Sequence, residues 1–575
     1  MKTKEKKTVY PLRRKFILFS FAAFSALLVW RAVYLHVINK DFLQDHGNAR
    51  SLRVVSIPAH RGMITDRNNE PLAISTPVDS IWAIPRQVLE NPEEIPRLAD
   101  LLDMSSVHLS EMLNDRIDRQ FVYLKRHISP DLARQISELE ILGINLQQEF
   151  KRYYPSGEIT AHLVGFTNVD DTGQEGLELA YDQWLQGEAG EKRVLKDRLG
   201  RTVRDIESIK KPDPGKDLVL SIDRRVQYLA YRELAAAVEF YQAKSGSLVV
   251  VDPVNGEILA LAAQPSYNPN NRSGLKSENF RNRAITDVFE PGSTLKPFTI
   301  AAGLESGLYE KNTLIQTSPG YLRVSNHVIS DMSNYGTLDL TGIIQKSSNV
   351  GTGKIGLAIG PEALWATLRA VGFGEQTGTG FPGESHGLLS SYTNWTELDL
   401  ASIAFGHGMA VTTLQLAQSY SVIASNGILR PLTFLKVGDE QVPNQRVMSP
   451  EIATTLRDML ETVVQSGGTG KRANIPFYRV AGKTGTAHKS TSEGYAEDRY
   501  LSLFAGFAPA TNPRLVMAVI IDEPQSGEHY GGQVAAPVFS KVIKGALRIL
   551  NIPPDDLPEL NTSDQTILKP ADTTG

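Results

Sequence analysis

Three short motifs, in a fixed order along the chain, constrain this protein more than any other feature. They are Ser293-Thr-Leu-Lys296, Ser347-Ser-Asn349 and Lys483-Thr-Gly485. Lys-Thr-Gly occurs once, whereas the first two patterns recur at Ser208, Ser273, Ser266 and Ser277. Together the three motifs predict acyl transfer through a serine ester, with a lysine replacing histidine as the base. The fold must therefore bring three distant segments to one site.

Ser293 differs from the other matches in its context. It follows Glu290-Pro-Gly292 and leads into an apolar segment from Thr294 to Leu304, which predicts a tight turn and then a helix. Pro297 lies early enough in that helix to be tolerated. A serine at a helix start has an exposed hydroxyl and lies near the positive end of the helix dipole. Lys296 lies on the same face, within reach of that hydroxyl. Alone, Ser293 would be interpreted as an ordinary N-cap, and the other motifs favour catalysis.

The second motif follows a predicted helix from Leu338 to Ile344. The pattern fits a polar connecting loop, or a short turn that presents a hydroxyl and an amide to the nucleophile. In the second case Ser347 could relay a proton between Lys296 and the leaving group, and Asn349 could hold a substrate amide.

The third motif lies in an alternating run from Tyr478 to Ala487, which predicts a strand. Two further strands are predicted at Tyr500–Pro509 and Leu515–Asp522. Lys483 alone would fit a solvated strand lysine. Gly482 and Gly485 favour a binding cleft, because glycine in a strand often lets a ligand approach closely.

The motif set resembles that of the penicillin-binding protein and serine β-lactamase superfamily. The resemblance implies that Ser293 is the acylated nucleophile, Lys296 its general base, Ser347 a proton shuttle and Lys483 a further positive charge. It also implies that Thr484 and Thr486, on either side of Gly485, hold the substrate's terminal carboxylate, and that the backbone N–H groups of Ser293 and Thr486 form the oxyanion hole. A lysine with a pKa of about 10.4 is a poor base at neutral pH. Lowering it by about 3 units costs roughly 4 kcal/mol, so the site must be rigid and mostly buried.

Length and composition exclude several other classes. The 575 residues suggest two or three domains, and a net charge of −4 gives no sign of a nucleic-acid surface. The chain has no cysteine, hence no disulfide or thiolate metal site, and it has no His-Glu-x-x-His zinc pattern. Gly383-Glu-Ser385-His-Gly387 matches a hydrolase nucleophile pattern, but no apolar strand precedes it, so we interpret it as accidental. No metal and no cofactor are expected.

The N-terminus predicts a membrane anchor. Seven Lys and Arg residues precede an apolar run from Phe16 to Ile38, which is long enough to cross a bilayer as a helix. Arg31 lies near one end and can reach the interface, and Trp30 and Tyr34 suit an aromatic belt. The basic cluster keeps residues 1–15 in the cytoplasm, so the rest of the chain is exported. A cleaved signal peptide is the alternative, but the run lacks a clear cleavage site.

Residues 39–215 form a polar, mixed region without the three motifs. It has charged residues beside glycine turns, in the segments Arg61-Gly62, Arg152–Gly157, Ala161–Phe166 and Gly173–Glu178. Such charges are expected where strands cross and ion pairs fix their geometry, so we interpret them as structural. Motif by motif, they also resemble the non-catalytic pedestal, or dimerisation-type, module of class B penicillin-binding proteins.

This resemblance implies an α+β multidomain fold with a single N-terminal transmembrane helix at 16–38 and a mixed β-rich pedestal at 39–215. A transpeptidase domain follows at 216–553, with an antiparallel sheet flanked by helices. Its first strands are predicted as a hairpin of Ser247–Val251 and Glu257–Leu261 around Asn255-Gly256. Residues 554–575 are rich in Pro, Asp and Thr and predict a disordered tail.

Within class B, the chain resembles the division-specific peptidoglycan D,D-transpeptidases of Gram-negative bacteria, in the segments Arg152–Asn168, Asp287–Thr294 and Gln345–Gly351. The resemblance implies cross-linking of septal cell wall from the inner membrane, with the catalytic domain in the periplasm at the division septum. The implied ligands are D-Ala-D-Ala stem peptides and β-lactams. An FtsW-type lipid II polymerase and other divisome proteins are the implied partners, with no nucleic acid.

Three alternatives stay open. A β-lactam-hydrolysing enzyme needs a base for the deacylating water, and Glu440 to Asn444 is the only Glu-x-x-x-Asn between the second and third motifs. It lies in a loop with Gly, Asp and Pro, and we interpret it as accidental. The intact motif set disfavours a non-enzymatic scaffold but would survive in a β-lactam sensor, which is disfavoured by the pedestal and by the lack of a multi-span sensor region. An elongation-type class B enzyme is the nearest rival within the family.

Overall fold

The computed structural model describes residues 11–43, 52–196, 202–438, 442–491 and 494–557. The chain divides into two compact units: unit 1 holds Met1–His60, Pro77–Phe150 and Gly187–Pro214, and unit 2 holds Arg61–Thr76, Lys151–Gln186 and Gly215–Gly575. Strands β3 (Pro71–Ala83) and β5 (Ile144–Tyr153) have residues in both units. The first four lysines of the basic cluster, Glu440 and residues 558–575 lie outside the described residues.

Unit 1 begins with the apolar helix. Helix α1 (Pro11–Val33) continues as a π-helical turn, η1 (Tyr34–Ile38). The stretch Pro11–Ile38 is the one helix of the described ranges that is long and apolar enough to cross a membrane, and none of it is buried. It contains the predicted span Phe16–Ile38 and fits a single-pass membrane anchor.

The rest of unit 1 contains a sheet and a helical cluster. Strands β1 (Leu52–Ile57), β8 (Gly190–Lys196) and β9 (Thr202–Lys210) form a three-stranded antiparallel sheet. The other elements pack around a separate core with the end of β3; they are α3 (Pro85–Leu89), η2 (Pro92–Glu94), α4 (Ile95–Leu102), α5 (Ser106–Asn114), β4 (Val122–Ile128) and α6 (Pro130–Glu138). Mixed α and β elements match the predicted pedestal.

Unit 2 contains a buried ion cluster built from the charged residues beside glycine turns. Arg61 Nη2 lies 2.7 Å from Glu178 Oε2, and Arg152 Nε lies 2.6 Å from Glu178 Oε1. Arg61 also pairs with Asp182 at 2.7 Å. Arg61, Arg152 and Glu178 are all buried. The prediction that these charges are structural is confirmed.

The cluster lies among short elements: β2 (Ile64–Thr65), η3 (Gly157–Ile159), α7 (Ala161–Val164), β6 (Phe166–Thr167), β7 (Gly173–Glu175), α8 (Gly176–Ala180), α9 (Asp182–Leu185) and β10 (Leu218–Val219).

Replacing Glu178 by Gln should lower the free energy of unfolding of unit 2 by about 3–5 kcal/mol, because it leaves two buried guanidinium groups without their shared carboxylate. Urea unfolding of the purified protein measures the change. Glu528→Gln, which removes the exposed partner of Arg472, is the matched control and should cost at most about 1 kcal/mol. Equal losses in the two variants would contradict this account.

The main part of unit 2 is a five-stranded antiparallel sheet in the order β12-β11-β21-β20-β19. Its strands are β11 (Ser245–Val251), β12 (Ile258–Gln264), β19 (Ala481–Thr491), β20 (Gly494–Ala508) and β21 (Leu515–Asp522). The predicted β21 and the β11–β12 hairpin are confirmed. The third-motif strand begins at Ala481 and not at Tyr478, because the N–H of Tyr478 closes a turn on the Ile475 carbonyl, at 3.1 Å, and Tyr478 does not pair with β20.

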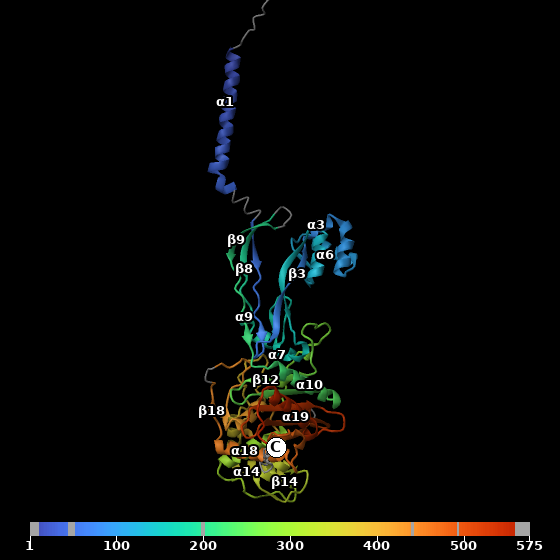
Figure 1. The fold of residues 1–575 in the computed structure, drawn as a ribbon, viewed down its shortest axis with the longest axis vertical. Helices are drawn as coiled ribbons and strands as arrows, with labels where there is room; N and C mark the ends of the chain where they lie inside the picture. The colour runs from blue at the N-terminus through green and yellow to red at the C-terminus, as the bar shows by residue number, and fades with distance from the viewer. Residues whose placement is uncertain (1–10, 44–51, 197–201, 439–441, 492–493, 558–575) are drawn as a thin grey trace, which may run out of the picture. The chain divides into compact units, whose positions relative to one another are not determined.

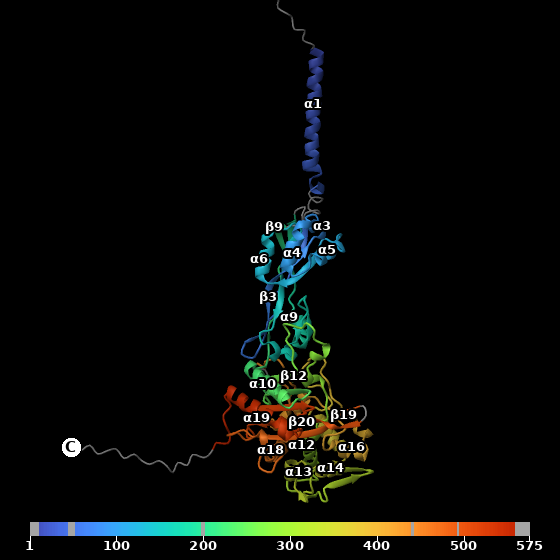
Figure 2. The same ribbon diagram turned by 90° about the vertical axis from the view of Figure 1, so that its right-hand side faces the viewer.

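Helices cover both faces of this sheet. Helices α10 (Arg224–Phe240) and α19 (Gly531–Ile549) pack on one face, over a core that includes Leu234, Val250 and Phe539 (Figures 1 and 2). The other face carries α11 (Arg283–Thr286), η5 (Gly292–Leu295), α12 (Lys296–Glu305), α17 (Thr413–Ala424) and α18 (Pro450–Val464). With both faces covered, β21 is buried at every position except its last.

The remaining elements of unit 2 surround this helical layer. They are η4 (Ser277–Asn279), β13 (Ile315–Gln316), β14 (Tyr321–Val324), β15 (His327–Ser330), β16 (Thr337–Leu338), α13 (Leu340–Lys346), α14 (Asn349–Ile359), α15 (Pro361–Ala370), η6 (Tyr392–Asn394), α16 (Glu397–Ile403), β17 (Ile428–Leu429), β18 (Gln445–Arg446) and η7 (Lys471–Ala473). The Gly383–Gly387 pattern lies outside regular structure, as its interpretation as accidental requires.

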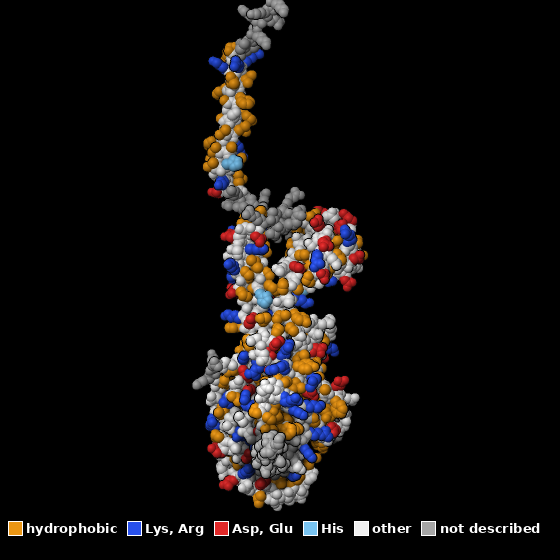
Figure 3. Space-filling model, in the orientation of Figure 1, with side chains coloured by type: hydrophobic (Ala, Val, Ile, Leu, Met, Phe, Trp, Pro, Cys, Tyr) orange, Lys and Arg blue, Asp and Glu red, His pale blue; other side chains and the backbone are white. Residues whose placement is uncertain are grey.

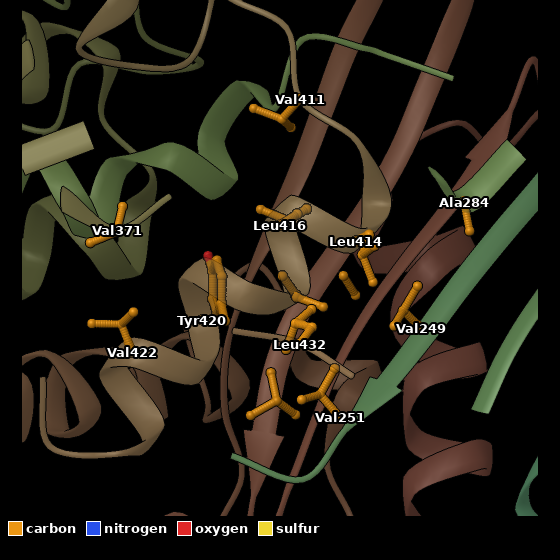
Figure 4. Close-up of a cluster of buried hydrophobic side chains, with 14 of the residues drawn as sticks. Val249, Val251, Ala284, Val371, Val411, Leu414, Leu416, Tyr420, Val422 and Leu432 are labelled. Atoms are coloured by element: carbon orange, nitrogen blue, oxygen red, sulfur yellow. The ribbon is translucent and has the colours of Figure 1, made fainter. Parts of the chain in front are cut away.

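The core between sheet and helices fixes the segment around Ser293. Figure 4 shows Val249 and Val251 of β11 facing Leu414 and Tyr420 of α17. Tyr420 is fully buried, and its hydroxyl donates a 2.8 Å hydrogen bond to the carbonyl of Thr294. A buried hydroxyl needs such a partner, so the core holds the residue next to Ser293 in one place.

Candidate active site

Ser293 lies in η5, a short 3₁₀ helix directly before α12. Its side chain is partly exposed, and its hydroxyl has no hydrogen-bond partner among the described residues. Its turn is held by neighbours: Thr294 Oγ1 donates to the Pro291 carbonyl at 2.6 Å, and Gly292 N donates to the Gly406 carbonyl at 2.9 Å. Gly406 has a φ of +94°, and a Cβ there would lie 2.0 Å from the Gly292 oxygen. The turn is thus fixed while the hydroxyl stays accessible.

Lys296 is the first residue of α12 and is fully buried. Its Nζ donates to Ser347 O at 2.5 Å, to Ser347 Oγ at 3.2 Å and to Asn349 Oδ1 at 2.7 Å. Burial, and then the charge of Lys483, lower the pKa of Lys296 well below its usual value, although Asp331 acts in the opposite direction. This is the shift that a lysine base requires.

Ser347 connects the two lysines. It ends α13 in the left-handed conformation, with a φ of +62°, which is uncommon for a residue other than glycine and which occurs preferentially at functional sites. Lys483 Nζ donates to Ser347 Oγ at 2.9 Å, so this hydroxyl contacts both lysines. Burial lowers the pKa of Lys483 to about 7. One hydroxyl between two lysines with lowered pKa values can pass a proton between them.

Asp331 follows β15 and supports the second motif, a role with no signal in the sequence. Its carboxylate accepts hydrogen bonds from Ser348 Oγ at 2.6 Å and from the backbone N–H groups of Asn349 and Val350 at 2.5 and 3.0 Å. It therefore lies at the N-terminus of α14, where a carboxylate is favoured. Asn349 Nδ2 donates to Ser330 O at 3.0 Å, which turns its Oδ1 toward Lys296. Asn349 thus orients the lysine here.

Strand β19, at the edge of the sheet, carries the third motif. Thr484 Oγ1 lies 2.7 Å from Thr469 Oγ1, and Thr486 Oγ1 accepts a hydrogen bond from Gly531 N at 3.0 Å. Gly531 begins α19, so the positive end of this 19-residue helix lies against the strand. A Cβ on Gly531 would lie 2.2 Å from the Gly485 oxygen, so only glycine allows this approach. Two hydroxyls beside a helix N-terminus suit a carboxylate.

Glu290, three residues before Ser293, joins the nucleophile turn to two other segments. Its carboxylate accepts hydrogen bonds from Gly408 N and from the Tyr495 hydroxyl, both at 2.9 Å, and contacts His407 Nδ1 at 2.8 Å. Burial raises the pKa of Glu290, but these three partners outweigh it and hold the pKa below its usual value. An ionised carboxylate therefore fixes the position of the turn.

The structure places the predicted residues in two groups. Lys296, Ser347, Asn349 and Lys483 form one hydrogen-bonded cluster, with Ser293 one turn before Lys296 and not bonded to it. Thr484, Gly485 and Thr486 follow Lys483 on the same strand. The three motifs do not predict the supporting roles of Asp331, Thr469, Glu290 and Gly531. A Gly-rich run, Ser466-Gly-Gly-Thr-Gly470, could have indicated Thr469. In the part of the chain that is described, no group of three or more His, Cys, Asp or Glu side chains could hold a metal ion.

Comparison with known proteins identifies the two domains and the family. Residues 246–544 match the penicillin-binding protein transpeptidase domain, and residues 56–220 match the penicillin-binding protein dimerisation domain. The chain is 46% identical to peptidoglycan D,D-transpeptidase FtsI of Escherichia coli over 537 residues, 92% of this chain and 91% of that one. It is 45% identical to a Pseudomonas aeruginosa protein named "Probable peptidoglycan D,D-transpeptidase PbpC", covering 93% of this chain and 95% of that one.

Solved structures extend the likeness to the fold. Penicillin-binding protein 3 of Mycobacterium tuberculosis, complexed with aztreonam, matches with a TM-score of 0.68 and 28% identity, covering 87% of this chain and 98% of that one. The predicted fold class is confirmed: an apolar N-terminal helix, a dimerisation domain, and a transpeptidase domain built of a sheet and helices. The chain belongs to the class B penicillin-binding proteins, which join a dimerisation domain to a transpeptidase domain.

Proposed function

We propose that this protein is a serine-type peptidoglycan D,D-transpeptidase that cross-links stem peptides through an acyl-enzyme at Ser293. The observation that carries the proposal is the Lys296–Ser347–Lys483 cluster, in which two buried lysines contact one hydroxyl beside an unbonded serine. The names of the relatives support the reaction: FtsI of Escherichia coli is a peptidoglycan D,D-transpeptidase.

The acylation step follows from the positions of these groups. The oxygen of Ser293 attacks the carbonyl carbon of the penultimate D-Ala as its proton passes to neutral Lys296. The backbone N–H groups of Ser293 and Thr486 stabilise the oxyanion. When the peptide C–N bond breaks, the proton passes through Ser347 to the departing D-Ala nitrogen. Charged Lys483 stabilises the hydroxyl that carries it.

The second half of the reaction reverses these proton transfers. The amine of a neighbouring stem attacks the ester, loses a proton to Lys296 and forms the cross-link, and Ser293 recovers its proton. Water in place of that amine would give carboxypeptidase activity. The terminal carboxylate of the donor stem is held by Thr484 and Thr486, beside the N-terminus of α19. Gly485, between the two threonines, lets the strand approach the turn that carries Ser293, since a Cβ there would lie 3.0 Å from Thr294 Cγ2 and 3.1 Å from the Pro291 oxygen.

β-Lactam exposure tests this proposal. Intact-protein mass spectrometry after incubation with benzylpenicillin should show one long-lived adduct, and Ser293→Ala should abolish it, because the variant lacks the hydroxyl that the proposal makes the nucleophile. The fold should survive, since a partly exposed serine at a helix start contributes only about 1 kcal/mol. Labelling of another residue, or release of the adduct within seconds, would show that the proposed site is wrong.

We also propose that the enzyme acts at the division septum, anchored in the inner membrane with its N-terminus in the cytoplasm and its catalytic domain in the periplasm. The basic residues before Phe16 and the apolar span Pro11–Ile38 support this orientation. The similarity to FtsI of Escherichia coli supports the septal role and partnership with an FtsW-type lipid II polymerase and other divisome proteins.

A further inference from the structure

Helix α19 has three exposed residues, and all three are cationic. They are Lys541, Lys544 and Arg548, and α19 contains no acidic residue. Spacings of three and four residues place the three side chains on one side of the helix. Like charges at these spacings repel each other, so the stripe lowers the stability of the helix.

Two neighbouring elements extend this stripe. Helix α10 and the turn η7 both pack against α19. The three elements together contain two carboxylates, Glu233 and Glu239, and eight cations, which we call the cationic face: Arg224, Arg225, Arg232, Lys471, Arg472, Lys541, Lys544 and Arg548. Figure 3, in the orientation in which α19 faces the viewer, shows Lys and Arg side chains gathered over this region. The excess is notable in a chain with a net charge of −4.

Local ion pairs neutralise only part of the cationic face. Glu233 is shared by Arg232 and Lys541, at 2.6 and 3.6 Å. Arg224, Arg225 and Arg472 each have a carboxylate within ion-pair distance. Within the described ranges, Lys471, Lys544 and Arg548 have none. The dipole of α19 favours a cation in its last turn, which accounts for Arg548. It does not account for Lys541 or for Lys471, which lies on another element.

The cationic face is separate from the candidate active site but lies in the same compact unit. Its two helices cover the face of the central sheet opposite to the one that carries Ser293 and α12. None of its residues contacts the cluster around Ser347. An anion held there would leave the cleft free for a stem peptide.

We propose that the cationic face binds carboxylate groups of the peptidoglycan polymer and holds a strand while one of its stems reacts. This inference rests on the proposed function. Every uncross-linked stem ends in a carboxylate, so a strand presents many anions to a surface with several cations. Weak contacts of this kind add up on a polymer and raise the effective concentration of stems near the cleft. Because the face is exposed, salt should screen the interaction.

The test uses the full-length protein in detergent micelles and purified peptidoglycan sacculi, with binding measured by co-sedimentation. In about 0.1 M salt, Lys541→Glu, Lys544→Glu and Arg548→Glu together should weaken binding on the order of tenfold. The control reverses three exposed cations elsewhere in unit 2: Lys276→Glu, Lys311→Glu and Arg323→Glu. It makes the same change in net charge and should keep binding within about twofold. Binding of the unaltered protein should also fall toward that of the variant in about 1 M salt, where the Debye length is roughly 3 Å.

Benzylpenicillin labelling of Ser293 should be unchanged in both variants, which shows that fold and cleft are intact. Sacculi with amidated carboxylates should bind the unaltered protein as weakly as the cationic-face variant does. Equal losses in the two variants, or full binding to amidated sacculi, would overturn the inference. The inference would also be overturned if the cationic-face variant bound polyglutamate more weakly but bound sacculi as well as the unaltered protein does. That result would assign the face to an acidic protein. Loss of penicillin labelling in the unaltered protein would count against the proposed function instead.

Discussion

Lys296→Arg should lower the rate of β-lactam acylation at Ser293 by about 10²–10⁴-fold, the contribution of a positioned general base. Lys296 is fully buried, and its lowered pKa makes a neutral amine available near neutral pH. A guanidinium stays protonated at any such pH and therefore cannot accept the serine proton. Stopped-flow measurement of the acylation rate, with the melting temperature of each variant, separates lost catalysis from lost folding.

Lys483→Arg is the matched control, since both lysines are buried and both contact Ser347 Oγ. We expect a loss of only about tenfold there, because the proposed role needs a positive donor and no proton acceptor. If Lys483→Arg costs as much as Lys296→Arg, or more, the two roles have been assigned the wrong way round.

The acylation rate should have a bell-shaped dependence on pH. The rate should rise as Lys296 loses its proton, since only the neutral amine is a base. It should fall again above about pH 7, because burial lowers the pKa of Lys483 to about 7 and its positive charge is lost there. The two limbs belong to the coupled pair, because the charge of Lys483 also lowers the pKa of Lys296.

Lys483→Arg should remove the falling limb, because an arginine stays charged far above pH 7. The variant should therefore be slower near neutral pH yet keep its rate at pH values where the unaltered protein loses activity. Measuring the acylation rate between about pH 5 and about pH 9 tests for both the rising and the falling limb. If the acylation rate of the unaltered protein instead rises steadily up to the highest pH measured, neutral Lys483 is sufficient for acylation and its positive charge is not needed.

The parts of the fold that could be predicted have a strong local signal. Strand β21 was predicted with its observed bounds, because Leu515 to Asp522 is a continuous apolar run between turn residues and is buried on both faces. Strand β20 begins at Gly494, six residues before its predicted start; the added residues do not form an apolar run, and the first of them pair with the neighbouring β19. Their pairing depends on a hairpin that hydrophobic periodicity does not reveal.

The same difference between local signals and tertiary contacts applies to the candidate active site. The motifs gave the residues that carry the proposed chemistry, because a lysine base and a hydroxyl shuttle require particular side chains. They could not give Asp331, which reaches Ser348 from a different hairpin, or Gly531, which reaches Thr486 from the last helix. Such supporting contacts depend on tertiary structure, and a single Asp or Gly has no pattern around it. The left-handed conformation of Ser347 was equally invisible in the sequence.

The proposed export to the periplasm gives the buried ion cluster a further consequence. The chain emerges N-terminus first, so Arg61 leaves the membrane 117 residues before its partner Glu178. Unit 1 is complete once Pro214 has emerged, whereas unit 2 must wait for the long final segment. Arg61 and Arg152 therefore stay hydrated during synthesis and are buried only at the end. Variants that leave either arginine unpaired should reduce the amount of protein that survives periplasmic proteases, while the molecules that do fold keep a normal active site.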